Sequence, residues 1–533
     1  MTSSGQAEAV ELPQSKRGFA EEIVQSISQH EWILLVLVLS LLVLIDVGKA
    51  YSEPLWFDEF FTLFLSRLST FADLVKAMPA DGQPPLQYLL THLALSCLGE
   101  SQLALRLPEL LAYTFVGLLT YRIVRFHGTM AQGLFALTMV MGGVIGCQAY
   151  TARPYGLLMA FTALAFVSWQ RAGLAQKRLL YLCGIAVGLG GAILSHHFGV
   201  IYVCLFLAVG EAVRLIERQR IDGGVLFATV VGLAPLSISL RLAHQSHLVL
   251  GEAVQHSTNY FYKPKLSDLM IYIQMFPVYL LVLVLVIASL FFLVALRVGG
   301  GRIQAGSERA ESIPAHEWAA ASALSLLLPM LLLISSFATG VFAARYAVGA
   351  SLGLAILSGW GLPRVGWLRK SGQAVLFTST ICFLLLRGGN FFATQLHEPF
   401  WRAKPAADAG SALLWNAPPD LPIVVANSVD FPTQWWYSPL AAKNRLVYVY
   451  DLEYAERQPE FLTDISLVFD KAYTPLPLSN YADFVHKNHR FLLLCTGNSR
   501  RDWIKPRLMA SGWNLEPIAQ LGQDALYQVS SNL

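Results

Sequence analysis

Long apolar runs separated by short polar segments fill most of the chain up to residue 390. The first run extends from Trp32 to about Gly48. Ten further runs lie near residues 106–121, 129–150, 154–170, 179–194, 198–213, 223–240, 269–296, 317–337, 342–360 and 373–390. A helix that crosses a bilayer needs about 20 predominantly apolar residues. The pattern therefore predicts a mainly α, polytopic membrane protein of about 11 transmembrane helices.

The shorter apolar run Pro85–Leu98 suits a helix that lies on the membrane better than one that crosses it. If it does not cross, the basic loops collect on the side of Lys16 and Arg17, as the positive-inside rule requires. Those loops hold Arg122, Arg125, Arg171, Lys177, Arg178, Arg214, Arg218, Arg220, Arg302, Arg309, Arg364, Arg369 and Lys370. We therefore expect a cytoplasmic N-terminal segment over 1–31 and a helix over 85–98 flat against the outer face.

This arrangement divides the chain into three parts. A transmembrane domain spans 32–390, and its first outer loop, about 49–105, carries amphipathic juxtamembrane helices. The segment 391–533 is richer in proline and polar residues. Its short β-rich runs predict a small α/β domain outside the membrane. These runs are Pro422–Ala426, Leu446–Tyr450, Phe491–Cys495 and Ala525–Val529.

Composition agrees with a membrane protein. Apolar residues make up 55% of the chain and charged residues 14%, whereas a soluble domain usually has about 25% charged residues. This excludes a disordered chain, a secreted disulfide scaffold and a simple soluble enzyme. The net charge of +3, without a basic stripe, gives no support for nucleic-acid binding. The six cysteines lack CxxC spacing, so small buried hydrophobes are favoured over a disulfide or metal set.

Three acidic residues in the first outer loop are candidates for chemistry. Asp58 and Glu59 lie among aromatic residues just after the first span, where partial burial favours a carboxylate that works as a general base. Neighbouring residues do not share a helix face, so the two acids should have different roles. Asp81 precedes a turn and a double proline in the same loop. The alternative is a solvated acidic pair on an amphipathic helix.

Several cations depart from the positive-inside pattern because they fall on the outer side. These are Arg106, Arg153, Arg345 and Lys263. The turn that contains His196 lies on the same side, and so does Tyr346, which follows Arg345. An arginine fork binds two phosphate oxygens, so the cluster suits an anionic lipid head group. The competing interpretation is a set of snorkelling or loop cations.

The order of these motifs resembles the integral-membrane glycosyltransferases of the C superfold. The acidic motif is followed by D-x-x-P-P-L-x-Y from Asp81, Arg-Leu-Pro at 106–108 and Ala-Arg-Pro-Tyr at 152–155. Ser-His-His-Phe at 195–198 and Arg-Tyr at 345–346 come next. The branch that it is most similar to holds protein O-mannosyltransferases and the lipid A aminoarabinose transferase.

The resemblance implies an inverting transferase that takes a sugar from a polyprenyl-phosphate carrier on the outer face of the membrane. Asp58 would be the catalytic base and Glu59 would support it. The lipid-phosphate and substrate contacts would come from Arg106, Arg153, Arg345, Tyr346, His196, Asp81 and Lys263. The partners would be the lipid-linked donor, a lipid, glycan or protein acceptor, and membrane lipids, with no nucleic acid.

The resemblance leaves cofactors and location less defined. Some relatives bind a divalent cation near the acidic loop, and Asp58 and Asp81 would be its ligands here. Family members often carry a histidine before the double proline, whereas this chain has Gln83, a poor metal ligand. The implied location is a bacterial inner membrane, with the N-terminus in the cytoplasm and the C-terminal domain in the periplasm.

Two other classes of protein are compatible with the spans. A transporter or flippase for a polyprenyl-linked or other anionic lipid would also carry buried charges, but such sites usually lie near the midplane between repeated halves. A scaffold that presents the C-terminal domain to partners would leave the ordered motifs unexplained.

Overall fold

The computed structural model describes most of the chain. The described residues are 30–143, 148–174, 176–254, 264–276, 278–287, 312–339, 342–365, 372–397, 399, 409–415, 417–455, 461–497 and 502–531. Lys263 and the expected cytoplasmic segment up to residue 29 lie outside them.

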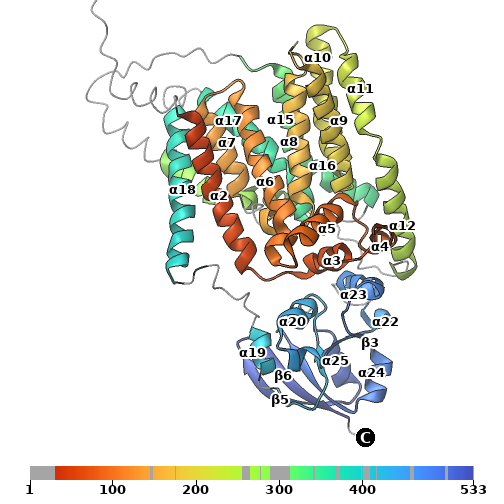
Figure 1. The fold of residues 1–533 in the computed structure, drawn as a ribbon. Helices are drawn as coiled ribbons and strands as arrows, with labels where there is room; N and C mark the ends of the chain where they lie inside the picture. Colours follow the sequence, from red (N-terminus) through yellow and green to blue (C-terminus); the bar gives the residue numbers. More distant parts are fainter. Residues whose placement is uncertain are drawn as a thin grey trace, which may run out of the picture.

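Every predicted apolar run contains a helix. The helices are α2 (Glu31–Ser52), α6 (Gln102–Arg125), α7 (Met130–Gly142), α8 (Tyr155–Arg171), α9 (Arg178–Ser195), α10 (Gly199–Arg218), α11 (Gly223–Gly232), α12 (Leu236–Val254), α13 (Ile271–Met275), Val278–Ile287, α15 (Ala315–Ser325), α16 (Leu327–Ile334), α17 (Gly349–Gly361) and α18 (Gly372–His397). They form a bundle with one apolar core, and α18 leads out of it toward the C-terminal domain (Figure 1).

The bundle belongs to an integral membrane protein. Six described helices are long and apolar enough to cross a bilayer, or up to eight if each of two bent helix pairs counts as one span. Exposed leucine, isoleucine, valine and phenylalanine side chains on these helices form surface that suits lipid. The count of 11 spans stays a prediction, because several predicted runs are occupied by shorter helices.

Three short helices lie between the bundle and the C-terminal domain (Figure 1). They are α3 (Phe57–Ser66), α4 (Phe71–Asp81) and α5 (Leu86–Leu98). Helix α5 is the segment expected to lie flat, and it packs against α3 and the start of α6. We call the end of the bundle that faces this layer the tail side, and the opposite end the far side.

The C-terminal domain contains the predicted α/β structure. Its strands are β1 (Ile423–Val425), β2 (Leu446–Tyr450), β3 (Leu478–Asn480), β4 (Arg490–Cys495), β5 (Asn514–Leu521) and β6 (Asp524–Ser530). The six-stranded sheet has the order β3-β2-β1-β4-β6-β5, with β1–β4 parallel to one another and β6 antiparallel to both neighbours. Helices α19 (Ala409–Trp415), α20 (Phe431–Tyr437), α21 (Leu440–Lys443), α22 (Leu452–Ala455), α23 (Phe461–Phe469), α24 (Tyr481–Lys487) and α25 (Ile504–Ala510) complete it.

The C-terminal domain docks on α3 through α20. The Leu55 N–H donates to Tyr437 Oη at 2.9 Å, and Thr433 Oγ1 donates to the Leu55 carbonyl at 3.1 Å. The Trp436 ring packs edge-on against Phe60, with 6.0 Å between ring centroids. A single apolar cluster contains residues of α3, of α6 and of the strands of the sheet. The segment with Asp58 and Glu59 therefore packs against both the bundle and the C-terminal domain.

Candidate active site

Asp58 lies in the first turn of α3, in the layer between the bundle and the C-terminal domain. The buried neighbours Leu55, Phe57 and Phe60 anchor this turn, so the backbone around the carboxylate is fixed. Its Oδ2 atom lies 3.1 Å from Nη2 of Arg345 and 4.0 Å from Nε of Arg153. With a side chain 15% exposed, Asp58 is partly reachable yet faces two cations.

Arg153 joins the two acidic motifs of the first loop. Its Nη1 lies 3.1 Å from Oδ2 of Asp81 and also donates to the Asp58 carbonyl at 3.4 Å. The same Asp81 oxygen accepts a hydrogen bond from the Tyr88 hydroxyl. Asp58 and Asp81, 23 positions apart in the sequence, therefore meet around one guanidinium rather than around each other.

The turn after Asp81 depends on glycine. Gly82 ends α4 with φ = 70°, and an added Cβ would lie 2.4 Å from Oγ of Ser246. The Gly82 carbonyl accepts from Nε2 of His197 at 2.6 Å. Since Nε2 donates there, Nδ1 of His197 accepts from Ser239 Oγ, 2.8 Å away. This histidine ties the turn to the bundle and has no nitrogen left for a ligand.

His196 is placed differently from His197. Its Nδ1 accepts the Phe198 N–H at 3.1 Å, so Nε2 carries the proton in the neutral ring. Its ring lies between Tyr155 and Tyr346, with centroid separations of 5.5 and 5.6 Å. Burial, then the charges of His197, Arg153 and Arg345, lower the pKa of His196 well below its usual value. It is therefore a neutral N–H donor, and its Nε2 has no described partner.

Arg345 comes from the short 3₁₀ helix Ala344–Ala347. Its guanidinium carbon lies 5.5 Å from the centroid of the Trp56 ring and 6.0 Å from that of Tyr346. The side chain remains 33% exposed, and its Nε has no described hydrogen-bond partner. Aromatic faces thus hold a cation beside Asp58 without neutralising it.

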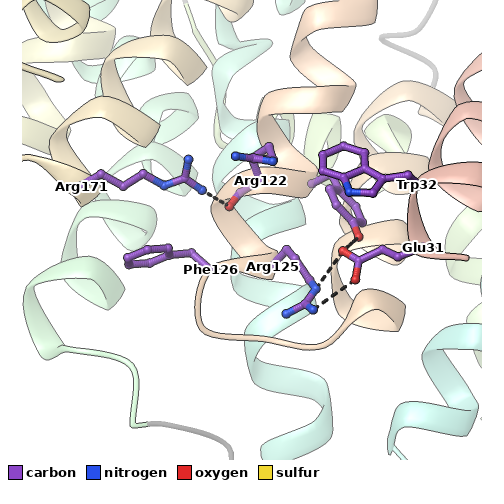
Figure 2. A pocket seen from close by; sticks show the side chains of 7 residues that line it. Glu31, Trp32, Arg122, Arg125, Phe126 and Arg171 are labelled. Atoms are coloured by element: carbon purple, nitrogen blue, oxygen red, sulfur yellow. Dashed lines mark hydrogen bonds and ion pairs between the residues drawn. The ribbon is translucent and has the colours of Figure 1, made fainter. Parts of the chain in front are cut away.

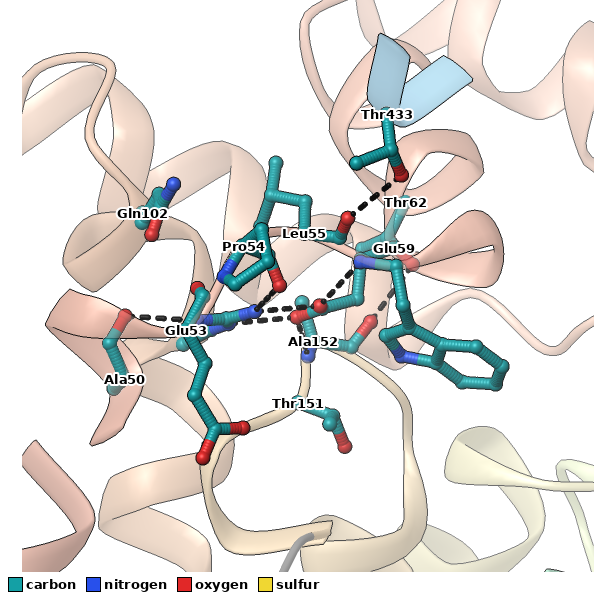
Figure 3. Close-up of polar contacts among 12 residues, drawn as sticks. Ala50, Glu53, Pro54, Leu55, Glu59, Thr62, Gln102, Thr151, Ala152 and Thr433 are labelled. Atoms are coloured by element: carbon teal, nitrogen blue, oxygen red, sulfur yellow. Dashed lines mark hydrogen bonds and ion pairs between the residues drawn. The ribbon is translucent and has the colours of Figure 1, made fainter. Parts of the chain in front are cut away.

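Glu59 belongs to a network of hydrogen bonds that includes Ala152 (Figure 3). Oε1 accepts from Arg106 Nε at 2.8 Å and from the Ala152 N–H at 2.7 Å. Oε2 accepts from Arg106 Nη2 at 2.7 Å and from the Trp56 N–H at 3.2 Å. Glu59 therefore fixes the entry to α3 and the loop before Arg153 relative to one another.

Arg106 is fully occupied by this network. Besides Glu59, it donates to the carbonyls of Ala50, Glu53 and Pro54 at 2.8–3.1 Å, and its side chain is 1% exposed. The sequence led us to expect a contact between Arg106 and a lipid phosphate. The geometry argues against that contact, because all the guanidinium nitrogens already bond to Glu59 or to backbone carbonyls.

One acidic residue at the site comes from the C-terminal domain. Asp470 begins a 3₁₀ turn that packs against α4 and is 1% exposed, and its Oδ1 has no described hydrogen-bond partner. Burial and the neighbouring Asp81 raise the pKa of Asp470 well above its usual value, against the opposing charge of Arg153. No sequence signal pointed to Asp470, since the C-terminal domain carries no recognisable motif.

Comparisons with known proteins fit this arrangement. A family model described as dolichyl-phosphate-mannose-protein mannosyltransferase matches residues 82–238. The crystal structure of ArnT from Cupriavidus metallidurans in the apo state matches with a TM-score of 0.57 and 14% identity over 93% of this chain and 97% of that chain. The chain has a GT-C glycosyltransferase fold. The resemblance expected from the motifs is thereby confirmed.

A second structure of the same relative supports the GT-C fold. ArnT from Cupriavidus metallidurans bound to undecaprenyl phosphate matches with a TM-score of 0.51 and 12% identity, over 94% of this chain and 98% of that chain. No curated protein sequence matches this chain. The matches point to a membrane glycosyltransferase without indicating its sugar or acceptor.

The GT-C fold brings most of the predicted site residues together. Within the described parts of the chain, buried polar atoms without hydrogen-bond partners gather around Asp58. They are Arg153 Nε, Arg345 Nε, His196 Nε2 and Trp56 Nε1, whereas Asp58 Oδ2 itself is held in the ion pair with Arg345. Buried polar groups are normally satisfied, so a concentration of exceptions is typical of a site that binds a polar ligand.

A divalent cation, which the resemblance left open, does not fit this geometry. Among the described residues, no group of three or more histidine, cysteine, aspartate or glutamate side chains is placed to hold a metal ion. Asp58 and Asp81, the two candidate ligands, each face an arginine. A cation between two such ion pairs would meet positive charge, so we assign it no role in the chemistry.

Proposed function

We propose that the chain is an inverting glycosyltransferase that moves a sugar from a polyprenyl-phosphate carrier to an acceptor hydroxyl on the outer face of the membrane. The observation that carries this proposal is the Asp58 carboxylate, which is partly exposed, pairs with Arg345, faces Arg153 and has nearby polar atoms without hydrogen-bond partners. Such a site offers a base and an anion-binding pair at one membrane interface.

The reaction that these groups support is a single displacement. Asp58 removes the proton from the acceptor hydroxyl while that oxygen attacks the anomeric carbon. The bond between this carbon and the phosphate oxygen breaks, and its electron pair stays on the phosphate. Attack from the face opposite the leaving phosphate inverts the anomeric configuration. General base catalysis of this kind contributes about 10²–10⁴-fold in rate.

Arg345 and Arg153 stabilise the charge that develops on the leaving phosphate. In the structure Arg345 bonds to Asp58, so donor binding has to exchange this contact for one with the phosphate. Arg345 is the more exposed of the two cations, and Arg153 is held by Asp81. The rings of His196 and Tyr346 pack against each other. His196 Nε2 and Tyr346 supply neutral contacts to the donor.

Glu59, Asp81 and Arg106 act through these residues. Glu59 and Arg106 hold the start of α3, and Asp81 orients Arg153. The basic residues of the far side, with the site on the tail side, support an outer location for the site under the positive-inside rule. We therefore place the protein in a bacterial inner membrane with its C-terminal domain in the periplasm.

Asp58→Asn tests the base directly. In cells that lack this protein, we expect a polyprenyl-linked sugar to accumulate, wild-type chain to clear it and Asp58→Asn to leave it. Asp73→Asn is the matched control, because Asp73 lies on α4 in the same layer and its side chain accepts a hydrogen bond from Thr70 in the helix cap. Full clearance by Asp58→Asn, at wild-type abundance, would remove Asp58 from the mechanism.

The alternative, a flippase for a polyprenyl-linked or other anionic lipid, makes a different prediction for the same cells. Without a transferase the donor accumulates in the outer leaflet, whereas without a flippase it stays in the inner leaflet. Periodate, which does not cross membranes, oxidises only sugars with neighbouring hydroxyls that face the outside. Donor protected from periodate in intact spheroplasts, and oxidised after lysis, would favour the flippase.

A further inference from the structure

A second polar cluster lies on the far side of the bundle, away from Asp58. Helices α2, α6 and α8 all run between the two sides, and α2 alone, with 22 residues, is about 33 Å long. At their far ends they line an open hollow of about 230 Å³, whose lining side chains are drawn in Figure 2. Its lining residues are Glu31, Trp32, Tyr121, Arg122, Arg125, Phe126 and Arg171.

The charges in this hollow do not balance. Arg125 forms a two-pronged pair with Glu31, through Nε at 3.0 Å and Nη2 at 3.1 Å, and the Tyr121 hydroxyl also donates to Glu31. That carboxylate is therefore fully engaged. Among the described residues no carboxylate forms an ion pair at contact distance with Arg122 or Arg171, although Glu31 also attracts Arg122. With one carboxylate and three arginines, the hollow has an excess of two positive charges (Figure 2).

Aromatic rings hold both remaining arginines in place. The Arg122 guanidinium carbon lies 5.7 Å from the centroid of the Trp32 ring, and that of Arg171 lies 5.1 Å from the Phe126 centroid. Arg171 Nη2 donates to the Arg122 carbonyl at 3.0 Å, whereas its buried Nε has no described partner. The N–H donors of both guanidinium groups are thus already oriented, so binding of a ligand costs little further side-chain entropy.

The position of the hollow indicates the source of its ligand. Trp32 is 59% exposed at the end of an apolar helix, as expected for a tryptophan at a membrane–water interface. Basic pockets between the ends of membrane helices are suited to phosphate-bearing lipid head groups. Its volume accommodates a phosphodiester and a small head group, while the acyl chains would lie along α2.

We propose that this hollow, formed by Arg122, Arg171 and Trp32, binds the phosphate of an anionic phospholipid from the leaflet on the far side. The site is separate from the transferase site, and the proposal holds whether or not Asp58 is the base. Arg122 and Arg171 bind the phosphate oxygens, Trp32 covers the glycerol region, and Arg125 stays paired with Glu31.

The test measures lipid binding to the purified full-length chain by native mass spectrometry. We expect phosphatidylglycerol to bind at least tenfold more tightly than phosphatidylcholine. Arg122→Gln/Arg171→Gln should abolish this preference. The control Arg218→Gln/Arg220→Gln removes the same charge from exposed positions on the same side and should keep it. Equal preference in the two double variants would overturn the proposal.

Two further measurements keep the result interpretable. Arg122→Lys/Arg171→Lys preserves charge but loses the forked geometry, and it should bind phosphatidylglycerol severalfold more weakly than wild type, even if the glutamine variant fails to fold. Unchanged binding by the lysine variant contradicts a fork-bound phosphate. Inorganic phosphate is the second probe. If phosphate binds through Arg122 and Arg171 while phosphatidylglycerol does not, the ligand is a soluble anion and the lipid assignment is wrong.

Discussion

Oδ2 of Asp58 lies 3.1 Å from Nη2 of Arg345, so the proposed base and the proposed phosphate ligand hold each other in this structure. The pair joins the first turn of α3 to a residue almost 290 positions later in the sequence. In the proposed mechanism, Arg345 exchanges its contact with Asp58 for one with the donor phosphate before transfer begins. We propose that donor binding and release of the base are coupled through this ion pair.

This coupling predicts how Arg345 variants behave. Arg345→Gln should weaken binding of undecaprenyl phosphate by roughly 10–100-fold, the value of a hydrogen bond to a charged group. Arg345→Lys should fall between Gln and wild type, since a lysine keeps the charge and loses the fork. Binding is measured by native mass spectrometry. The control is Arg67→Gln, since Arg67 is a cation of the same layer that pairs with Glu100. An equal loss in the control would indicate a nonspecific charge effect.

The Glu59–Arg106 pair predicts a loss of stability rather than a specific loss of donor binding. Both side chains are almost completely buried, and removal of one partner from such a pair typically costs about 3–5 kcal/mol. Arg106→Met should therefore lower the melting temperature of the purified protein by many degrees and reduce its abundance in the membrane. Tryptophan fluorescence during heating follows this transition.

The matched control for this pair is Arg67→Met, which breaks the exposed pair with Glu100 and should change the melting temperature little. The double variant Arg106→Met/Glu59→Gln should recover part of the loss, because it leaves no uncompensated buried charge. If Arg106→Met melts like wild type but no longer binds undecaprenyl phosphate, Arg106 contacts the phosphate after all.

Asp470 predicts a pH dependence of stability. Burial and the nearby Asp81 raise its pKa, so the folded protein holds a proton that the unfolded chain releases. A carboxyl group with a raised pKa contributes most below its unfolded value, near pH 4, and this contribution is lost as the pH rises toward the folded value. The free energy of unfolding should therefore fall as the pH rises from 5 to 8, by at most about 1.4 kcal/mol per pH unit from this group, and the melting temperature should fall with it.

Asp470→Asn mimics the protonated carboxyl and isolates its contribution. The variant should melt higher than wild type at pH 8, with a flatter pH profile, and should retain transfer activity. Asp483→Asn, on α24 at the other end of the domain, is the control and should keep the wild-type profile. A profile unchanged by Asp470→Asn would show that the carboxyl is not protonated in the folded protein.

The pattern of apolar and polar residues predicts the strands that are buried. It does not predict strands that are short or mostly exposed. The four predicted strands of the C-terminal domain form β1, β2, β4 and β6. Strand β5 was missed because it lies at the sheet edge with mostly exposed residues and contains Pro517, and β3 has only three residues. Strand β5 forms because it pairs with β6 across a hairpin, a contact that no single-sequence pattern encodes.

The candidate site follows the same rule. Charges beside apolar runs are rare and costly, so the sequence alone makes Asp58, Arg153 and Arg345 candidates. The order of the motifs supports the same three residues. The sequence could not show which charges pair with one another. Glu59 takes Arg106 out of reach of a ligand, and Asp470 comes from the C-terminal domain. Both facts depend on contacts between distant segments.

The orientation of the protein gives the last prediction. Described arginines on the far side, such as Arg122, Arg171 and Arg218, lead us to expect that side in the cytoplasm under the positive-inside rule. Alkaline phosphatase is active only outside the cytoplasm, so a fusion after residue 400 should be active and a fusion after residue 176, on the far side, should be inactive. The reverse pattern would place Asp58 on the cytoplasmic face. Transfer from a donor in the outer leaflet would then be impossible, whereas the ion pair of Asp58 with Arg345 would be unaffected.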